Sequence, residues 1–212
     1  MKSKLDQPHD RNSFFKSMGT LFAGFMAEKV EEALESVGPR LLRPPGALNE
    51  LAFLTACTRC DKCIEACPQG SLRRAPPGAG LAMGTPHIIP REMPCFLCES
   101  LPCITACPDG ALVWPNIKTQ DNGLKEGAEA VRIGMARVKP SRCLTFDSPA
   151  REAERCRACI ERCPYPGAAI RMYIHGDSQI SRPEVIEEGC TGCGLCEFGC
   201  PASLPGIVVR AN

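Results

Sequence analysis

Several features that point to common protein functions are missing from this sequence. Aromatic residues are few, with eight Phe, two Tyr and one Trp in 212 residues, so ring packing contributes little to any core. Neither sign of charge prevails: 25 Lys and Arg face 24 Asp and Glu, and the net charge of +1 gives no overall attraction to nucleic acid. The sequence contains no Ser-His-Asp pattern, phosphate loop or dinucleotide fingerprint.

Candidate catalytic residues are also missing. The three histidines, His9, His87 and His175, are not spaced like ligands of one metal, and we expect surface or packing roles for them. We expect Asp61, Glu65 and Asp109 to be solvated charges that lower the potential of any redox centre nearby, rather than proton relays. The chain is therefore not expected to be an enzyme by itself.

Cysteine, in contrast, is unusually abundant, with 16 in 212 residues. A soluble fold of this size with few large apolar residues is expected to need covalent or metal cross-links. The cysteines fall into four groups of four, each followed by proline, and none is left over. Motif one is Cys57, Cys60, Cys63 and Cys67; motif two is Cys95, Cys98, Cys103 and Cys107; motif three is Cys143, Cys156, Cys159 and Cys163; motif four is Cys190, Cys193, Cys196 and Cys200.

The spacing within the motifs predicts iron–sulfur clusters. Motifs one and four read C-x2-C-x2-C-x3-C-P, motif two has four residues between its second and third cysteines, and motif three has twelve residues after its first. A C-x2-C-x2-C loop places three thiolates on three irons of one cubane, and the fourth cysteine ligates the cluster of a partner motif. Thiolates are soft ligands that suit such clusters. We therefore predict four 4Fe–4S clusters with all sixteen cysteines as iron ligands.

Two other uses of cysteine fit the spacing less well. A disulfide framework has cysteines scattered over paired segments, in an oxidising compartment. Structural zinc gathers four ligands from two C-x2-C pairs, whereas these motifs add a third cysteine and then C-x3-C-P. Motif three is the least regular. In that motif Cys143 could instead be a free thiol, which would leave a cluster with an open iron or three irons.

The N-terminal stretch differs from the cysteine-rich remainder. Apolar residues at helical spacing over 13–37 predict an amphipathic helix that docks on the body or a partner, or alternatively anchors at a membrane surface. "DRNSFFK" (10–16) resembles a twin-arginine export motif in which Asn12 replaces the second arginine, with no clear cleavage site after it. We expect a tail and helix over 1–40 and favour a cytoplasmic location, with the periplasm as the alternative.

A four-motif domain is predicted over 41–212, of class α+β. Strand, cysteine loop, short helix and strand form a ferredoxin unit, and two units face each other about a pseudo-twofold axis. The four motifs therefore predict two ferredoxin-like two-cluster folds in one compact body. The gap at 116–134 is expected to be a loop and a short helix. Short β-like runs precede motifs at 87–89, 135–138 and 184–186, and follow motifs at 111–114, 168–174 and 206–209.

Longer stretches resemble the NapG/MauM family of ferredoxin-type proteins. "LLRPPGALNE" (41–50), "ACTRCDKCIEACP" (56–68) and "GLAMGTPHIIPREMPCFLCESLPCITACPDGAL" (80–112) carry the resemblance. "RCLTF", "RCRACIERCP" and "GCTGCGLCEFGCP" continue it to about residue 209. The "RPPGA" and "GTP" stretches contain no cysteine, so they make the resemblance more specific than the cysteines alone.

The resemblance implies an electron carrier with four clusters. In that family such a carrier works at the periplasmic face beside a membrane quinol-oxidising partner, in nitrate reduction or methylamine dehydrogenase formation. We expect an electron-transfer subunit of an oxidoreductase system whose partners are other redox proteins. We expect it to reach the membrane only through a partner or the N-terminal helix. A maturation factor for another redox enzyme and an iron–sulfur redox sensor are the alternatives.

The sequence leaves open which motifs share clusters. The four-cluster subunits of molybdenum oxidoreductases have a similar second motif, and that analogy favours pairing motif one with motif four and motif two with motif three. Sequential pairing, one with two and three with four, is the alternative. The set of sixteen ligands is the same in both cases.

Overall fold

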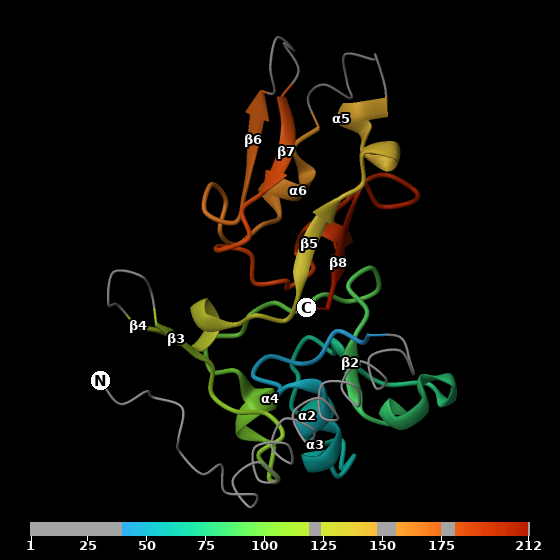
Figure 1. Ribbon diagram of the computed structural model, residues 1–212, viewed down its shortest axis with the longest axis vertical. Coiled ribbons are helices and arrows are strands. Elements are labelled where there is room, and N and C mark those ends of the chain that lie inside the picture. Colours follow the sequence, from blue (N-terminus) through green and yellow to red (C-terminus); the bar gives the residue numbers. More distant parts are fainter. Residues whose placement is uncertain (1–39, 119–123, 148–155, 175–180, 212) are drawn as a thin grey trace, which may run out of the picture. The chain divides into compact units, whose positions relative to one another are not determined.

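The structure, a computed structural model, describes residues 40–118, 124–147, 156–174 and 181–211 (Figure 1). The chain divides into one unit of residues 1–39 and a second of residues 40–212. The predicted N-terminal helix and the export-like segment lie outside the described residues. Within the described part, no helix is long and apolar enough to cross a membrane.

The first half of the described unit, residues 40–115, contains motifs one and two. Its first helix is preceded by Asn49, whose side chain accepts a hydrogen bond of 3.0 Å from the N–H of Ala52 and so caps the helix. Its two strands pair antiparallel, with Leu72 opposite Ile88. The elements are α2 (Glu50–Ala56), α3 (Lys62–Glu65), β1 (Leu72–Arg74), a 3₁₀ turn (Pro77–Ala82), β2 (Pro86–Ile88) and α4 (Pro102–Thr105).

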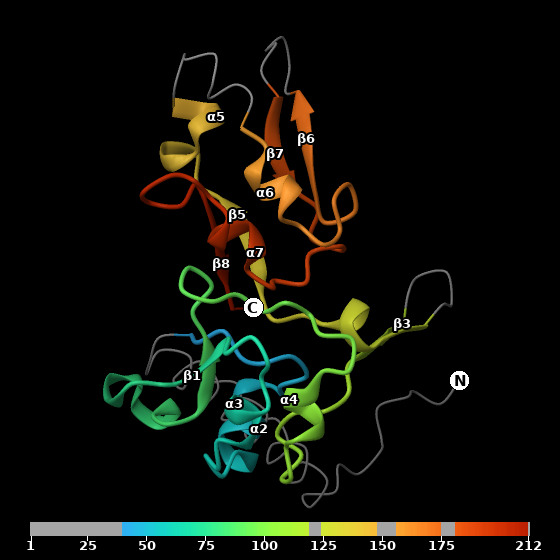
Figure 2. The same ribbon diagram turned by 180° about the vertical axis from the view of Figure 1, so that it is seen from behind.

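The second half, residues 135–211, contains motifs three and four. Its elements, yellow to red in Figures 1 and 2, form a group separate from the blue and green elements of the first half. They are β5 (Met135–Val138), a 3₁₀ turn (Pro140–Arg142), α5 (Leu144–Asp147), α6 (Ala158–Glu161), β6 (Ile170–Ile174), β7 (Ser181–Val185), α7 (Leu195–Phe198) and β8 (Ile207–Arg210). The connection between the halves contains β3 (Asn116–Lys118), β4 (Leu124–Glu126) and a 3₁₀ turn (Gly127–Ala130).

Both halves pair their segments in the same way. In the second half β5, which precedes motif three, pairs antiparallel with β8, which follows motif four, and β6 and β7 form a hairpin between the motifs. In the first half β1 and β2 form the equivalent hairpin. The outer pair is reduced there to a bridge between Ala47 and Leu112, beside a hydrogen bond from the N–H of Leu48 to the carbonyl of Ala111. The repeated cysteine motifs therefore lie in a repeated topology.

Most of the predicted β-like runs coincide with strands. The run at 135–138 is β5, and four others overlap β2, β6, β7 and β8. The run at 111–114 is wrong as a strand, since only Leu112 makes a bridge there. The neighbouring segment contains Pro44 and Pro45, which have no N–H to donate, so a longer ladder cannot form.

The gap at 116–134 also differs from the prediction. The expected loop and short helix are replaced by the antiparallel pair β3 and β4, with Ile117 opposite Lys125, followed by a 3₁₀ turn. The sequence does contain a signal for this arrangement. Asn122 and Gly123 form an Asn-Gly dipeptide, a sequence that favours hairpin turns.

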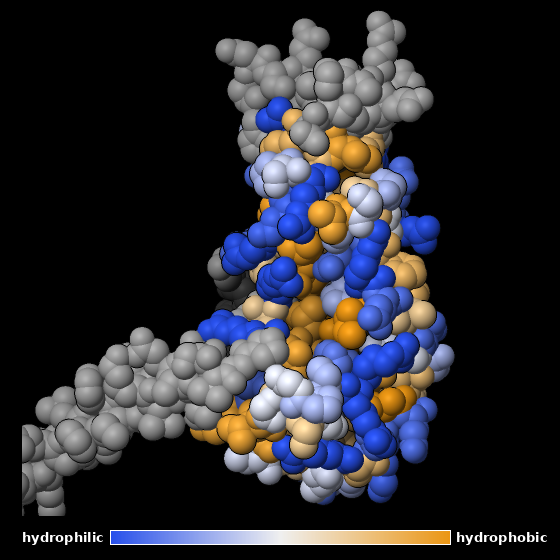
Figure 3. Space-filling view, turned by 90° about the vertical axis from the view of Figure 1, so that its right-hand side faces the viewer, coloured by the Kyte–Doolittle hydropathy of each residue, from blue (hydrophilic) through white to orange (hydrophobic). Residues whose placement is uncertain are grey.

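The core is built from aliphatic side chains and cysteines. Phe53, Val131 and Leu101 are among its most completely buried large side chains, and Phe53 is the aromatic residue among them. Six cysteines lie buried in the same cluster of apolar side chains: Cys63, Cys95, Cys103, Cys190, Cys193 and Cys196. On the face shown in Figure 3, hydrophobic and hydrophilic residues are interleaved. The six buried thiols therefore belong to the core, and any group that they bind lies in the core as well.

Candidate metal centres

The four motifs share one local geometry around a four-residue helix. The third cysteine is the second residue of α3, α4, α6 or α7, and the fourth cysteine lies two residues beyond the end of that helix. A helix of four residues has too few hydrogen bonds to be stable alone, so its surroundings must hold it. Motif three keeps this geometry in spite of its irregular spacing, which places Cys159 and Cys163 like their counterparts.

The loops of motifs one, two and four also share a left-handed backbone. In each motif, the residue before the second cysteine and the residue two before the third cysteine have positive φ. They are Arg59 (59°) and Asp61 (63°), Leu97 (51°) and Leu101 (40°), and Gly192 (70°) and Gly194 (90°). Outside glycine this conformation costs about 1–3 kcal/mol for each residue. Such turns direct successive N–H groups inward and make concavities that bind anions, as in many iron–sulfur sites.

Motif three departs from this backbone pattern. Arg157 occupies the position that corresponds to Asp61, and its φ is −128°. Its first cysteine, Cys143, comes from a different segment and follows a 3₁₀ turn. The sulfur of Cys143 lies 3.2 Å from the hydroxyl oxygen of Thr145, which is buried. A side-chain hydroxyl therefore approaches this thiol, in a motif whose loop lacks the left-handed residue.

Three cavities in the described part of the chain are each lined by four cysteines. In every case three cysteines come from one motif and one is the fourth cysteine of another motif. Cys95, Cys98 and Cys103 share a cavity with Cys67. Cys190, Cys193 and Cys196 share one with Cys163, and Cys143, Cys156 and Cys159 share one with Cys200.

The remaining four cysteines, Cys57, Cys60, Cys63 and Cys107, belong together by exclusion and by proximity. Cys57 and Cys107 are among the groups whose charges raise the pKa of the Cys63 thiol, after the larger effect of burial. The helices α3 and α4 contact each other, as α6 and α7 do. Cys60 is the exposed cysteine of the sixteen.

These positions decide the pairing of the motifs. Motif one exchanges fourth cysteines with motif two, and motif three with motif four. The cavities do not fit the favoured prediction, motif one with motif four and motif two with motif three, and they fit the sequential alternative. The physical reason is the short hairpins β1–β2 and β6–β7, which turn the chain back so that successive motifs face each other.

Burial is the main influence on the thiols. It raises the pKa of Cys63, Cys95 and Cys159 to about 12 and that of Cys103 to about 11. Burial raises the pKa of Cys163, Cys193 and Cys196 as well. These thiols are protonated at neutral pH when no metal is bound. Iron must therefore displace their protons, as is general for thiolate ligands.

Backbone N–H groups act in the opposite direction. The N–H of Ser71 donates to the sulfur of Cys67 and that of Gly206 to the sulfur of Cys200, both over 3.3 Å. A hydrogen bond from the N–H of Leu97 lowers the pKa of Cys95, which burial raises. Donors to a sulfur stabilise its thiolate form and, in a metal site, tune the potential.

The arrangement fits a cluster better than a single ion. All sixteen cysteines carry free thiols. In the described residues, no three Cys, His, Asp or Glu side chains lie close enough together to hold one metal ion. A cubane is wider than an ion and takes one thiolate at each iron. Four thiols around a cavity, with inward N–H groups beside them, are the donor set that such a group requires.

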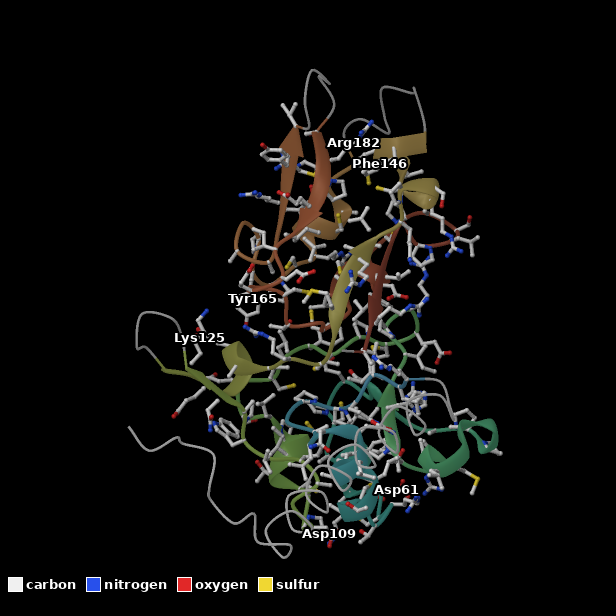
Figure 4. All side chains as sticks on the ribbon, in the orientation of Figure 1. Asp61, Asp109, Lys125, Phe146, Tyr165 and Arg182 are labelled. Atoms are coloured by element: carbon white, nitrogen blue, oxygen red, sulfur yellow. The ribbon has the colours of Figure 1, made fainter. Side chains whose placement is uncertain are left out.

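The other candidates from the sequence have structural partners. Ring atom Nδ1 of the buried His87 lies 3.0 Å from the carbonyl oxygen of Arg73, which is a packing role, whereas His9 and His175 lie outside the described residues. Asp61 pairs with Arg74, and Asp109 accepts a hydrogen bond of 2.6 Å from Thr58; both carboxylates are labelled in Figure 4. Neither is placed as a proton relay.

Comparisons with known proteins agree with this picture. A 4Fe-4S dicluster domain matches residues 56–111, which contain motifs one and two, and a 4Fe-4S binding domain matches residues 187–203. The chain is 35% identical to the ferredoxin-type protein NapG of Escherichia coli over 209 residues, 94% of this chain and 84% of that protein. It is 37% identical to the methylamine utilization ferredoxin-type protein MauM of Methylorubrum extorquens over 194 residues, 90% of this chain and 81% of that protein.

The chain belongs to the NapG/MauM family of ferredoxin-type proteins. It is also 35% identical to NapG of Shigella flexneri, with the same shares of the two chains covered. No solved structure matches it. Membership of the NapG/MauM family and the two 4Fe-4S domains identify an iron–sulfur protein of electron transfer.

Proposed function

We propose that this NapG/MauM protein passes single electrons along four 4Fe–4S clusters, between a quinol- or membrane-linked donor and a redox enzyme. The observation that carries the proposal is the repeated set of three cysteines from one motif and one from its partner. We number each site by the motif that supplies three ligands. Site one has Cys57, Cys60, Cys63 and Cys107; site two has Cys95, Cys98, Cys103 and Cys67; site three has Cys143, Cys156, Cys159 and Cys200; site four has Cys190, Cys193, Cys196 and Cys163.

The clusters supply one-electron chemistry, and the residues around them set its conditions. Cys95 of site two and Cys193 of site four are buried, which reduces the contact of these ligands with water. N–H donors such as those of Ser71 and Gly206 stabilise the negative charge that a reduced site gains, which raises its potential. One-electron transfer requires no side chain to move a proton, and Asp61 and Asp109 are paired with Arg74 and Thr58.

Two two-cluster folds in one body follow from the same pairing. Sites one and two share the first half of the described unit, and sites three and four share the second. Partners are expected to be redox proteins, because an electron carrier needs a donor and an acceptor. The quinol-linked donor and the redox enzyme that accepts electrons are the roles that the family resemblance implies.

The test uses the full chain, reconstituted with iron and sulfide under anaerobic conditions. The protein is reduced with dithionite, freed of excess reductant and mixed with cytochrome c as a one-electron acceptor. We expect rapid reoxidation that delivers about four electrons per chain, one from each cluster. A fully loaded protein that dithionite cannot reduce, or that reduces no acceptor, would argue against electron transfer and for a role in assembly.

A further inference from the structure

The two halves of the protein meet at motifs two and four. The N–H of Cys95 donates a hydrogen bond of 2.9 Å to the carbonyl oxygen of Cys193. Cys95 is 8% exposed and Cys193 is 7% exposed, so this contact is buried. Sites two and four are thus joined by a short path through the main chain.

Arg91 fixes this contact from the first half. One nitrogen of its guanidinium group, Nη1, donates to the carbonyls of Glu197 at 3.0 Å and Cys200 at 2.9 Å. The other, Nη2, donates to the carbonyl of Ala202 at 3.1 Å. These acceptors lie at the C-terminal end of α7 and just beyond it, where helix carbonyls have no partner within the helix. Arg91 lies four residues before Cys95, the first cysteine of motif two. Its side chain therefore binds the end of motif four close to the start of motif two.

Close packing of Gly194 on Pro90 fixes the contact on the other side. Gly194 has a φ of +90°, and a Cβ added to it would lie 2.6 Å from the Cβ of Pro90. No side chain fits between these two segments. The segment 90–95 is therefore held against the motif-four loop at three points: by packing at Pro90, by hydrogen bonds at Arg91 and by the main-chain bond at Cys95.

We propose that electrons cross between the two halves at Cys95 and Cys193, with Arg91 as the positioning residue of this junction. The four sites then form a chain in the order one, two, four, three. Sites one and three are its two ends, and Cys60 of site one is exposed at the surface of the described unit. The inference rests on the proposed function. It adds the route, which neither the cysteine motifs nor the sequence order gives.

Each transfer along this chain balances as a one-electron step. One cluster is oxidised by one electron and its neighbour is reduced by one electron, with no bond made or broken. Within each half, the exchanged fourth cysteines bring two sites together: Cys67 lines site two, and Cys163 lines site four. Between the halves, the Cys95–Cys193 hydrogen bond is the link between cysteine motifs. An external donor at one end and an external acceptor at the other complete the balance.

The test compares Arg91→Ala with Arg132→Ala in the reconstituted full chain. Arg132 also donates to main-chain carbonyls, those of Val131 at 2.7 Å and Glu188 at 3.0 Å, but it does not link the first half to the second. The first readout is the EPR spectrum of the fully reduced protein, in which neighbouring clusters split each other's signals. We expect Arg91→Ala to lose the component of the splitting that arises between sites two and four, with iron content unchanged. Arg132→Ala should keep it.

The second readout is reoxidation by cytochrome c. In the parent protein we expect reoxidation in a single phase, because electrons from all four sites can reach the acceptor along the chain of clusters. In Arg91→Ala we expect two phases of about two electrons each, because each half holds two clusters and only one half is well connected to the acceptor. Arg91→Lys keeps the positive charge without the fork of donors and should restore the single phase in part.

A second pair of variants covers the case in which Arg91→Ala loses iron. Gly194→Ala adds a methyl group against Pro90, whereas Gly167→Ala carries the same unfavourable φ, +82° in Gly167, with no atom within 4 Å of the added Cβ. We expect the loss of splitting in Gly194→Ala alone.

The outcomes separate the two proposals. A parent protein that passes no electrons overturns the proposed function. A parent that does pass electrons, with Arg91→Ala and Gly194→Ala keeping its splitting and its single phase, overturns the junction alone. Loss of the splitting in Arg132→Ala or Gly167→Ala as well overturns the assignment to Arg91 and Gly194.

Discussion

Arg43 donates a hydrogen bond of 2.8 Å to the hydroxyl of Thr85 and so joins the two cysteine-free stretches, "RPPGA" and "GTP", that carry part of the family resemblance. The same guanidinium group donates to the carbonyl of Pro86 at 3.0 Å and to both carboxylate oxygens of Glu50 at 2.9 and 2.5 Å. It also lies 4.7 Å from the centre of the Phe53 ring. The two stretches therefore act together, and their role is to hold α2 against the segment that leads into β2.

Replacement of Arg43 by methionine tests that role. Arg43 is 7% exposed and Thr85 is fully buried, so the change leaves buried acceptors without a donor. We expect the free energy of unfolding to fall by about 2–4 kcal/mol, measured by denaturant unfolding of the loaded protein. The matched control is Arg137→Met on the exposed side of β5, for which about 0.5 kcal/mol or less is expected. Equal effects in the two variants would contradict the structural role.

Gly46, in the "RPPGA" stretch, is required for close approach of two main-chain segments. It has a φ of +73°, and a Cβ there would lie 2.1 Å from the carbonyl oxygen of Val113. Gly110 has a φ of +65° and no neighbour within 4 Å, so Gly110→Ala measures the backbone penalty alone. We expect Gly46→Ala to lower the free energy of unfolding by about 1–3 kcal/mol more than Gly110→Ala does. Equal losses of the free energy of unfolding in Gly46→Ala and Gly110→Ala would contradict a requirement for glycine at position 46.

His87 should make stability fall in mild acid. Burial is the main cause that lowers the pKa of His87, and the charges of Arg43 and Arg73 lower it further, while the Arg73 carbonyl and Glu92 act against them. Below about pH 6.5, the ordinary pKa of histidine, the unfolded chain therefore binds a proton at His87 that the folded chain does not bind until the pH is lower. The free energy of unfolding is therefore not reduced by His87 above that pH, and it decreases as the pH falls from there toward the lowered pKa of His87.

The measurement for His87 is the midpoint of thermal unfolding across this pH range, in the parent protein and in His87→Gln. The variant keeps a side-chain donor for the Arg73 carbonyl but does not titrate. We expect a smaller loss of stability with falling pH in the variant. Parallel curves for the two proteins would rule out His87 as the cause.

The pairing of the motifs can be tested by substitution of one fourth cysteine. In the structure Cys67 lines site two, so Cys67→Ser should weaken that site and expose Cys95, Cys98 and Cys103 to alkylation by iodoacetamide. Peptide mass spectrometry then reports which thiols react. Cys107→Ser is the matched change and should expose Cys57, Cys60 and Cys63 instead. Alkylation of the motif-four cysteines in Cys67→Ser would support the pairing of motif one with motif four.

The sequence predicted local features well, because the cysteine spacing is itself local. It predicted the order of strand, cysteine loop, short helix and strand, and it located most of the strands. The left-handed turns at Arg59 and Leu101 could not be predicted, since these side chains normally avoid positive φ and the surrounding packing imposes it. The proximity of Cys67 to Cys103 depends on how the first half folds back on itself between motifs one and two, which cysteine spacing does not encode.

Contacts between segments far apart in the sequence could not be predicted either, because local spacing does not encode them. Nothing in the sequence around Arg91 distinguishes it from other exposed arginines, yet its acceptors lie more than 100 residues away. The same holds for Arg43 and Thr85, although the resemblance marked both stretches.

The central claim is that four complete clusters occupy these sites, and the most direct measurement is the content of iron and acid-labile sulfide in the reconstituted full chain, with Mössbauer spectra to identify the cluster type. Sixteen cysteines in four complete sets predict about sixteen irons and as many sulfides per chain, all in cubane clusters. Substantially fewer irons after full reconstitution, with unreacted thiols in any of the four sets, would contradict the account.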